Sequence, residues 1–354
     1  MSSAFTRRSG LLGITAAALL AATSPMTAFA GTWDSPSVTT RRRSPVATGT
    51  ALSWLSGAGD DVAGNIAGGG FGRWRGEPAT YARIWCDQGE NQTQIWMLDA
   101  FTQAGWTGTV DIANGGPSDW TTAATGSMDA TWTAFCRTLH AKWGKLAAVH
   151  LSMAHELNGD WYPWSVRPGM EASFKKAWIR WHGIVTRELI AKGRNVKFCL
   201  SYNSDSLEVP VQALYPGAAY VDVIGTDFYN MWLGTPGKGN LHTQAEWDAH
   251  RNDKAGTSPR GIQAWFDFAK AMGKPISFPE WGSSPQNFDD SPFFIESMNK
   301  IFRANAAANP AKPAAGQVAG EAYFNTHDEC RLYGGAATRI PRSAAKYKEL
   351  VFGR

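Results

Sequence analysis

Short apolar runs alternate with helical stretches along this sequence, from about residue 50 to its last residues. Several runs are apolar at consecutive positions, which is typical of strands buried on both faces of a sheet. The predicted strands cover residues 82–86, 108–113, 146–153, 196–202, 220–226, 275–279 and 318–325, with an earlier one near 66–74.

Between these strands, apolar side chains recur at helical spacing. The predicted helices cover residues 131–143, 172–192, 260–272 and 292–308, and Gly193 and Gly273 follow the second and third of them. About eight strand–helix alternations in about 300 residues predict an α/β protein with a single (β/α)8 TIM barrel. A doubly wound open sheet is the alternative. Its phosphate-binding fingerprint is missing, because Gly68–Gly72 lacks the G-x-G-x-x-G spacing before a helix, and we interpret this segment as a tight turn at the barrel mouth.

Polar side chains follow the predicted strands at the points where they end. They are Asn114, His155, Glu156, Asn158, Tyr202, Asn203, Asp227, Tyr229, Glu280, Trp281, Asn325 and His327. The carboxyl ends of barrel strands meet at one mouth, where the active sites of such barrels lie. The sequence therefore predicts a single functional site at this mouth.

The first 30 residues have the pattern of a signal peptide. Arg7 and Arg8 precede an apolar run from Leu11 to Leu20, which is too short to span a membrane, and Ala28-Phe29-Ala30 fits a cleavage site. Thr6–Leu12 also resembles a twin-arginine signal, with an ordinary secretory signal as the alternative. We therefore expect a secreted protein, extracellular or periplasmic, whose mature chain begins at Gly31.

The rest of the chain divides into a flexible leader, residues 31–50, and a barrel domain, residues 51–354. The leader is rich in Ser, Thr and Pro and carries Arg41-Arg42-Arg43, which we interpret as solvated, with binding to an anionic surface as a minor alternative. The formal net charge of +4 gives no basis for a nucleic-acid partner. We expect a monomer without a membrane span.

Tryptophan and cysteine add two further constraints. The 17 Trp residues fit carbohydrate binding, since aromatic faces stack on sugar rings, although most of them are expected to pack in the core. The spacing of Cys86, Cys136, Cys199 and Cys330 matches no zinc pattern. Disulfides are permitted in an exported protein, and the four cysteines allow three pairings; a buried thiol is the alternative for Cys199.

Glu156 and Glu280 follow the fourth and seventh predicted strands. Glycoside hydrolysis requires two carboxyl groups beside the scissile bond, one protonated near neutral pH and the other ionised. A structural salt bridge or a helix cap is the alternative for each glutamate.

The neighbours of these glutamates suggest how they are tuned. His155 is placed to orient Glu156 or a sugar, and Tyr229 to donate a hydrogen bond to Glu280. Five further residues are expected to bind substrate: Asn158, Trp161, Trp164, Asp227 and Trp281, the last as the floor of the cleft. The long segment 230–258, with Lys238, His242 and Trp247, is expected to be a loop that shapes the cleft or a surface insertion.

Three motifs resemble known segments of glycoside hydrolase family 26, the β-mannanase family of retaining barrel glycosidases. His155-Glu156-Leu157-Asn158-Gly159-Asp160-Trp161-Tyr162-Pro163-Trp164 is similar to the segment that carries the acid/base. The second motif runs from Tyr215-Pro216-Gly217 to Asp227-Phe228-Tyr229 and resembles the sixth strand. Lys274-Pro275 and Pro279-Glu280-Trp281-Gly282 resemble the nucleophile segment.

The resemblance implies roles for four residues. Glu156 would be the acid/base, Glu280 the nucleophile, His155 a contact on the glycone side and Tyr229 the hydrogen-bond partner of the nucleophile. Two segments depart from the family pattern: Ser152-Met153-Ala154 before the His-Glu pair, and the eighth strand, Ala322–His327, which lacks a Trp. The expected substrate is β-1,4-mannan or a related β-glycan, with β-1,3-xylan, mixed-linkage glucan and bacterial exopolysaccharides left open.

Two other classes of function remain as alternatives. One is a catalytically silent carbohydrate-binding barrel, against which the presence of both glutamates argues. The other is a metal-dependent barrel hydrolase, but His150 and His155, five residues apart on a strand-like segment, point to opposite faces, so we expect no metal or cofactor. We predict that hydrolysis survives a strong chelator, an outcome that would remove the metal-dependent alternative.

Overall fold

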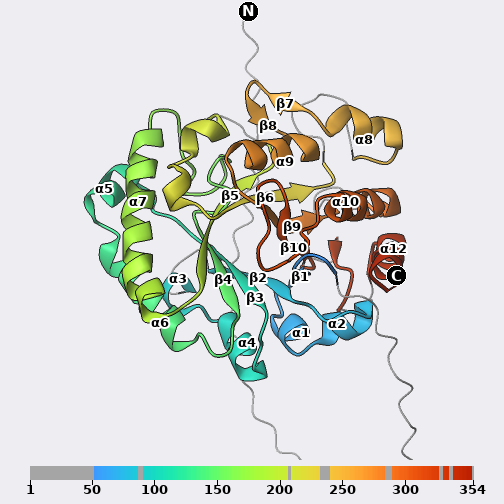
Figure 1. Cartoon of the computed structure of the whole chain (residues 1–354), viewed down its shortest axis with the longest axis horizontal. Helices are drawn as coiled ribbons and strands as arrows, with labels where there is room; N and C mark the ends of the chain where they lie inside the picture. The colour runs from blue at the N-terminus through green and yellow to red at the C-terminus, as the bar shows by residue number, and fades with distance from the viewer. Residues whose placement is uncertain are drawn as a thin grey trace, which may run out of the picture. The chain divides into compact units, whose positions relative to one another are not determined.

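Eight parallel strands close into a barrel in the computed structural model (Figure 1), in the spatial order β1-β10-β9-β6-β5-β4-β3-β2. Their bounds are β1 Ser56–Gly59, β2 Tyr81–Cys86, β3 Thr109–Asn114, β4 Ala148–Met153, β5 Val196–Asn203, β6 Val223–Tyr229, β9 Ile276–Gly282 and β10 Val318–Phe324. Helices connect the strands and surround the barrel, so the predicted (β/α)8 fold is confirmed.

The structure describes residues 52–86, 91–205, 209–231, 240–283, 289–326, 330–334 and 338–352. The predicted signal peptide and leader, Lys238 and His327 lie outside these residues. The domain boundaries drawn from the sequence therefore stay predictions.

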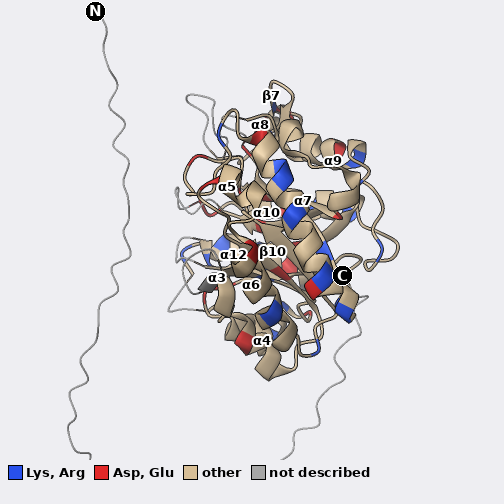
Figure 2. Ribbon diagram, turned by 90° about the vertical axis from the view of Figure 1, so that its left-hand side faces the viewer, with Lys and Arg blue, Asp and Glu red and all other residues tan. Residues whose placement is uncertain are grey.

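The helices of the described residues have the following bounds. They are α1 Gly64–Ala67, α2 Gly70–Arg75, α3 Asn91–Gln94, α4 Leu98–Ala104, α5 Trp120–Thr125, α6 Asp129–Ala141, α7 Glu171–Glu188, α8 Gln244–His250, α9 Ile262–Ala271, α10 Pro292–Ala304 and α12 Pro341–Phe352. Each of the four predicted helices corresponds to one of them, namely α6, α7 extended by a short 3-10 turn, α9 and α10. Figure 2 shows Lys and Arg at several positions along α7, and this helix buries Trp178 and Trp181. Among the described residues, none of the helices combines the length and the apolar character that crossing a membrane requires.

The strand predicted near residues 66–74 is wrong, because this segment forms α1 and α2. Its glycines weaken the helical pattern in the sequence, but Ile66 and Phe71 are buried and Phe71 packs on Tyr347 at 5.9 Å between ring centroids. The expected tight turn lies at Gly69, whose φ of 74° is left-handed. The first strand is instead Ser56–Gly59.

The described residues of the segment 230–258, namely 230–231 and 240–258, are also more ordered than expected. Its described part contains α8, which begins with a capping box between Thr243 and Glu246, and the start of a small hairpin, β7 Lys254–Ala255 with β8 Ser258–Pro259. Trp247 is buried against Phe294. It therefore belongs to the core and does not line a cleft.

The four cysteines are buried thiols, so the structure contains none of the three pairings that the sequence allowed. Cys86 and Cys330 donate weak hydrogen bonds to the carbonyl groups of Ala113 and Thr326. Burial raises the pKa of the Cys136 thiol to about 12. The expectation of a buried thiol at Cys199 is confirmed.

The first barrel strand, Ser-Gly-Ala-Gly, closes the barrel because it carries almost no side chains. Gly57 pairs with Tyr81 of β2, and a Cβ atom on Gly57 would lie 1.7 Å from the carbonyl oxygen of Tyr81. A residue with any side chain at this position would push β1 away from β2.

We predict that Gly57→Ala destabilises the protein by about 3 kcal/mol or more, at the upper end of the range for overpacking. Urea unfolding of the two proteins measures the change. Gly64→Ala in α1 is the matched control, because a Cβ there meets nothing within 4 Å, and it should leave stability unchanged or raise it slightly. Equal stability of the Gly57→Ala variant and the wild type would contradict the close strand approach.

Candidate active site

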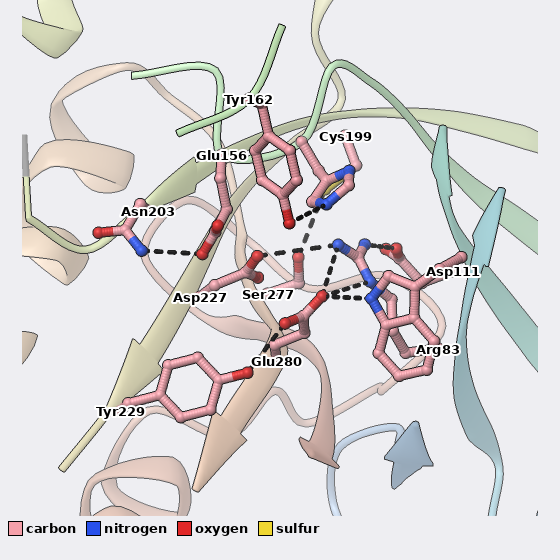
Figure 3. Close-up of polar contacts among 12 residues, drawn as sticks. Arg83, Asp111, Glu156, Tyr162, Cys199, Asn203, Asp227, Tyr229, Ser277 and Glu280 are labelled. Carbon is pink, nitrogen blue, oxygen red and sulfur yellow. Dashed lines mark hydrogen bonds and ion pairs between the residues drawn. The ribbon is translucent and has the colours of Figure 1, made fainter. Parts of the chain in front are cut away.

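Polar side chains from six neighbouring barrel strands or their carboxyl ends meet inside the mouth of the barrel (Figure 3). They include Arg83 on β2, Asp111 on β3, Glu156 after β4, Asn203 at the end of β5, Asp227 and Tyr229 on β6, and Glu280 on β9. The sheet order places these strands side by side, so residues distant in the sequence come together.

Glu280 is 7% exposed and accepts hydrogen bonds on both carboxylate oxygens. Oε1 accepts from Arg83 through Nε at 3.3 Å and Nη2 at 3.2 Å, and from Trp85 Nε1 at 2.6 Å. Oε2 accepts from the Tyr229 hydroxyl at 2.9 Å. A guanidinium and two neutral donors thus hold this carboxylate in one orientation and stabilise its charge.

Glu156 is as buried as Glu280 but has different neighbours. Its Oε1 accepts from Asn203 Nδ2 at 2.8 Å and its Oε2 from Trp161 Nε1 at 2.9 Å, and both donors are neutral. Burial, followed by repulsion from Glu280, raises the pKa of Glu156 to about 7. Near neutral pH, this carboxyl group is therefore able to hold or release a proton.

The backbone that carries Glu156 is strained. Ala154 and Glu156 have φ angles of 60° and 51°, a left-handed conformation that costs non-glycine residues about 1–3 kcal/mol each. Hydrogen bonds from their N–H groups to the carbonyl groups of Asn114 and Ser201, at 2.8 and 3.1 Å, hold this turn against β3 and β5. This left-handed turn places Glu156 at the mouth immediately after the end of β4.

Arg83 is a buried cation with three acidic neighbours. Its Nη1 donates to Asp111, its Nε and Nη2 to Glu280, and Nη2 lies 3.8 Å from Asp227 Oδ2. Asp227 is fully buried, and its carboxyl oxygens have no hydrogen-bond partner among the described residues. Burial, followed by repulsion from Glu280, raises the pKa of Asp227 well above its usual range.

His155 lies in an aromatic pocket beside the two glutamates. Its Nε2 is 3.3 Å from the Tyr162 hydroxyl, and its ring contacts Trp164 at 5.5 Å between centroids. Burial, followed by the positive charge of Arg83, lowers the pKa of His155 to about 4. The imidazole is therefore neutral above this pH.

Three residues predicted to bind substrate make structural contacts. Asn158 is buried and bonds to the backbone of Asn203 in both directions, at 2.8 and 2.9 Å. Trp164 is buried and donates to the carbonyl of His155 at 2.9 Å. Trp281 faces the helices, because neighbouring residues of a strand point to opposite sides, and it packs on Phe302.

Other polar residues at the predicted strand ends also make hydrogen bonds that stabilise the fold. Asn325 donates to Asp60 at 2.7 Å, and the Tyr202 hydroxyl donates to the carbonyl of Val211. His150 is a buried core residue, as expected, and contacts Tyr81. Trp161 is 45% exposed beside Glu156 and thus keeps a face open to solvent at the mouth.

The sequence reasoning missed Arg83, Trp85 and Asp111. The signal was present, since an arginine and an aspartate stand in the middle of two apolar strands, Tyr81–Cys86 and Thr109–Asn114. Residues two apart on a strand share a face, so Arg83 and Trp85 both point to the barrel interior. A charge inside a buried strand is expensive unless it is paired, and it therefore marks a site.

Metal ligation has no support from the described residues. Within them, no three His, Cys, Asp or Glu side chains are arranged to hold a metal ion.

Residues 134–242 match the model of Glycosyl hydrolase family 26. Endoglucanase H of Acetivibrio thermocellus is 27% identical over 226 residues, which are 63% of this chain and 22% of that protein. The chain thus spans about a fifth of the length of this curated relative.

Solved structures share the barrel at low identity. The catalytic domain of a GH26 endo-β-1,4-mannanase from Bacillus sp. JAMB-750 matches with a TM-score of 0.54 and 15% identity, over 84% of this chain and 86% of that one. A GH26 β-mannanase from Bacteroides ovatus matches with a TM-score of 0.53 and 13% identity, over 85% and 88% of the two chains. At this identity the likeness supports the fold.

The barrel and these matches make the chain similar to glycoside hydrolases of family 26. The resemblance to family 26 that the sequence motifs indicated is confirmed. The matching model covers two of the three motifs, those at residues 155–164 and 215–229.

We predict that Asn158→Ala destabilises the protein by about 2–3 kcal/mol, because it leaves two buried backbone groups of Asn203 without partners. Thermal unfolding measures the change. Asn195→Ala is the matched control: the Asn195 side chain also bonds to a backbone carbonyl, that of Ala147, but it is exposed and should cost less than about 1 kcal/mol. Equal losses in the two variants would contradict a structural role for Asn158.

Proposed function

We propose that the protein is a retaining glycoside hydrolase that cleaves β-glycosidic bonds in a polysaccharide. Glu156 acts as the acid/base and Glu280 as the nucleophile. The observation that carries the proposal is the contrast between their surroundings: Glu280 is bound by a guanidinium, whereas Glu156 has only neutral donors and a pKa raised to about 7. This reaction requires two carboxyl groups in different environments, so that one is protonated while the other is ionised.

The two steps of the reaction follow from these states. Glu280 attacks the anomeric carbon, while Glu156 gives its proton to the leaving glycosidic oxygen, and a covalent glycosyl-enzyme forms. Glu156, now ionised, takes a proton from water, which attacks the anomeric carbon and releases Glu280. The mechanism needs no cofactor, and it is the one that the family resemblance implies.

Three further residues support the pair. The Tyr229 hydroxyl orients the attacking carboxylate through the bond at 2.9 Å. Trp161 covers Glu156 with an exposed ring, suited to stack on the sugar at the leaving-group side. Asp227 and His155 are buried beside Glu280, and in this proposal they contact the sugar on the glycone side.

The proposed substrate is β-1,4-mannan or a related β-glycan. Mannan is supported by the sequence motifs and by the mannanases that share the fold. A β-glucan is the second candidate, because the curated relative is named an endoglucanase.

We also propose that the enzyme is exported, acts as a monomer and has its catalytic barrel at residues 51–354. Export rests on the signal-like pattern of residues 1–30, with its arginine pair, apolar run and Ala-x-Ala site.

For the reaction itself, we predict that Glu156→Gln lowers kcat/KM on the polysaccharide by about 10²–10⁴-fold, the contribution of a general acid. The loss should be much smaller on an aryl glycoside with an activated leaving group, which departs without a proton. Glu280→Gln should abolish hydrolysis of both substrates. Glu296→Gln, which removes a surface carboxylate paired with Lys300, is the control and should change neither rate. Full activity of Glu156→Gln on the polysaccharide would overturn the proposal.

The pH profile provides a second test. Glu156 must be protonated in the free enzyme to act as the acid, so kcat/KM should fall as the pH rises through about 7, the value to which its pKa is raised. Above that pH the decline should be about tenfold per unit. The decline should vanish in Glu156→Gln. A wild-type profile that stays flat between pH 6 and 9 would contradict the assignment of the acid.

The substrate is tested with a panel of mannan, galactomannan, β-1,3-xylan, mixed-linkage glucan and bacterial exopolysaccharides. We expect reducing ends to appear from mannan or from a glucan. The absence of product from every β-glycan would contradict the proposed activity.

A further inference from the structure

A chain of buried hydrogen bonds continues from Glu280 through the barrel interior to its opposite side. Arg83, which donates to Glu280, also donates to Asp111. The second oxygen of Asp111 accepts from the Tyr81 hydroxyl at 2.8 Å, and the same hydroxyl is 3.1 Å from His150 Nδ1. The exposed fraction of each of these four residues is at most 5%.

The register of the sheet brings the members of this chain together. Arg83 on β2 is the direct partner of Asp111 on β3, and Asp111 is the direct partner of His150 on β4. Tyr81 lies two residues before Arg83 and therefore on the same face. Gly320 on β10 makes room for it, since a Cβ there would lie 2.8 Å from the Tyr81 ring.

The protons along the chain can be assigned. The single hydroxyl proton of Tyr81 goes to Asp111, so the Tyr81 oxygen accepts from His150, which must carry its proton on Nδ1. Burial lowers the pKa of His150, which favours this neutral form. The chain is therefore fully directed: His150 donates to Tyr81, and Tyr81 and Arg83 both donate to Asp111.

Asp111 determines how Arg83 meets Glu280. A guanidinium is planar, and its donors are fixed relative to one another. When Nη1 is held by Asp111, Nε and Nη2 can only point toward Glu280. A buried ion pair is weak evidence for stability, because apolar residues of the same volume often replace it without loss. Apolar residues in place of this ion pair would not orient Arg83 toward Glu280.

We propose that Asp111 and Tyr81 are positioning residues for the Glu280 carboxylate, acting through Arg83, and that His150 is the last member of this chain. The inference deepens the proposed function and rests on Glu280 as its nucleophile. His150 also lines a cavity of about 500 Å³ beside the amino ends of the strands, with Thr109, Lys197 and Asp222, so the chain reaches the face of the barrel opposite the mouth.

The test compares single substitutions along the chain. Asp111→Asn keeps the shape but removes the charge, and we expect kcat/KM to fall about 100-fold, as for a misplaced reacting group. Tyr81→Phe keeps the charge and removes one bond, with an expected loss of about tenfold. His150→Phe should lose no more than about threefold, because it lies four hydrogen bonds from Glu280. The expected loss of kcat/KM thus decreases with the number of hydrogen bonds between the substituted residue and Glu280.

Leaving-group dependence separates positioning of the nucleophile from other roles. Because both substrates need Glu280 to attack, Asp111→Asn should lose as much on an activated aryl glycoside as on the polysaccharide, unlike Glu156→Gln. Tyr202→Phe is the matched control for a buried tyrosine on a barrel strand, and Asp129→Asn is the control for an aspartate bonded by two nitrogens of an arginine, Arg180. Neither control variant should change kcat/KM by more than about twofold.

A measurement without substrate tests the positioning of Arg83 independently of the proposed function. Hydrogen exchange of the Arg83 Nε–H, followed by NMR, should be at least about tenfold faster in Asp111→Asn than in wild type and unchanged in Tyr202→Phe. If the wild type cleaved no glycan, the proposed function would fail, and this exchange rate would still decide whether Asp111 holds Arg83. Unchanged exchange in Asp111→Asn, or activity losses that follow only the unfolding free energy of each variant, would overturn the inference.

Discussion

The guanidinium of Arg83 faces more buried carboxyl groups than one positive charge can balance. Asp111, Asp227 and Glu280 all lie within 4 Å of it, and Glu156 is close enough to feel the charge of Glu280. Within the described residues, Arg83 is the one cation that forms an ion pair with any of the four. Burial, followed by repulsion from Glu280, raises the pKa values of the two groups that accept no hydrogen bond from Arg83, namely Asp227 and Glu156. The division of protonation that the proposed reaction needs thus follows from burial together with the repulsion among carboxyl groups that share one cation.

The barrel makes this arrangement specific through the two-residue period of its strands. Arg83 and Trp85 reach Glu280 because they share the inner face of β2. On β9, Glu280 points inward and Trp281 outward, where its Nε1 donates to Glu321 at 2.6 Å. Burial raises the pKa of Glu321 to about 7, so the wall behind Glu280 holds a second carboxyl group that titrates in the same pH range as Glu156. A slip of one residue in β9 would exchange these two environments.

Much of this could be predicted from the sequence, and the failures have physical reasons. The apolar runs and the polar residues that end them located seven strands, the mouth and both glutamates. The first strand was missed because Ser-Gly-Ala-Gly has no apolar run, and the glycines of residues 66–74 concealed two helices held by tertiary packing. The structural contacts of Asn158, Trp164 and Trp281 were not predicted, because closeness to a glutamate in sequence does not fix the direction of a side chain. Arg83 and Asp111 were missed because each is a single charge inside an apolar strand. The partner of such a charge can be named only when the order of the strands in the sheet is known.

In the proposed reaction Glu280, held by Arg83, Trp85 and Tyr229, attacks the sugar, while the nearby Asp227 and Glu156 do not. A 2-deoxy-2-fluoro glycoside that carries an activated leaving group should trap the covalent intermediate, and mass spectrometry of the labelled peptides identifies the residue that attacked. We expect one sugar per protein molecule, attached to the peptide that contains Glu280. A sugar attached to Asp227 or Glu156, or turnover of this substrate with inversion and no trapped sugar, would contradict it.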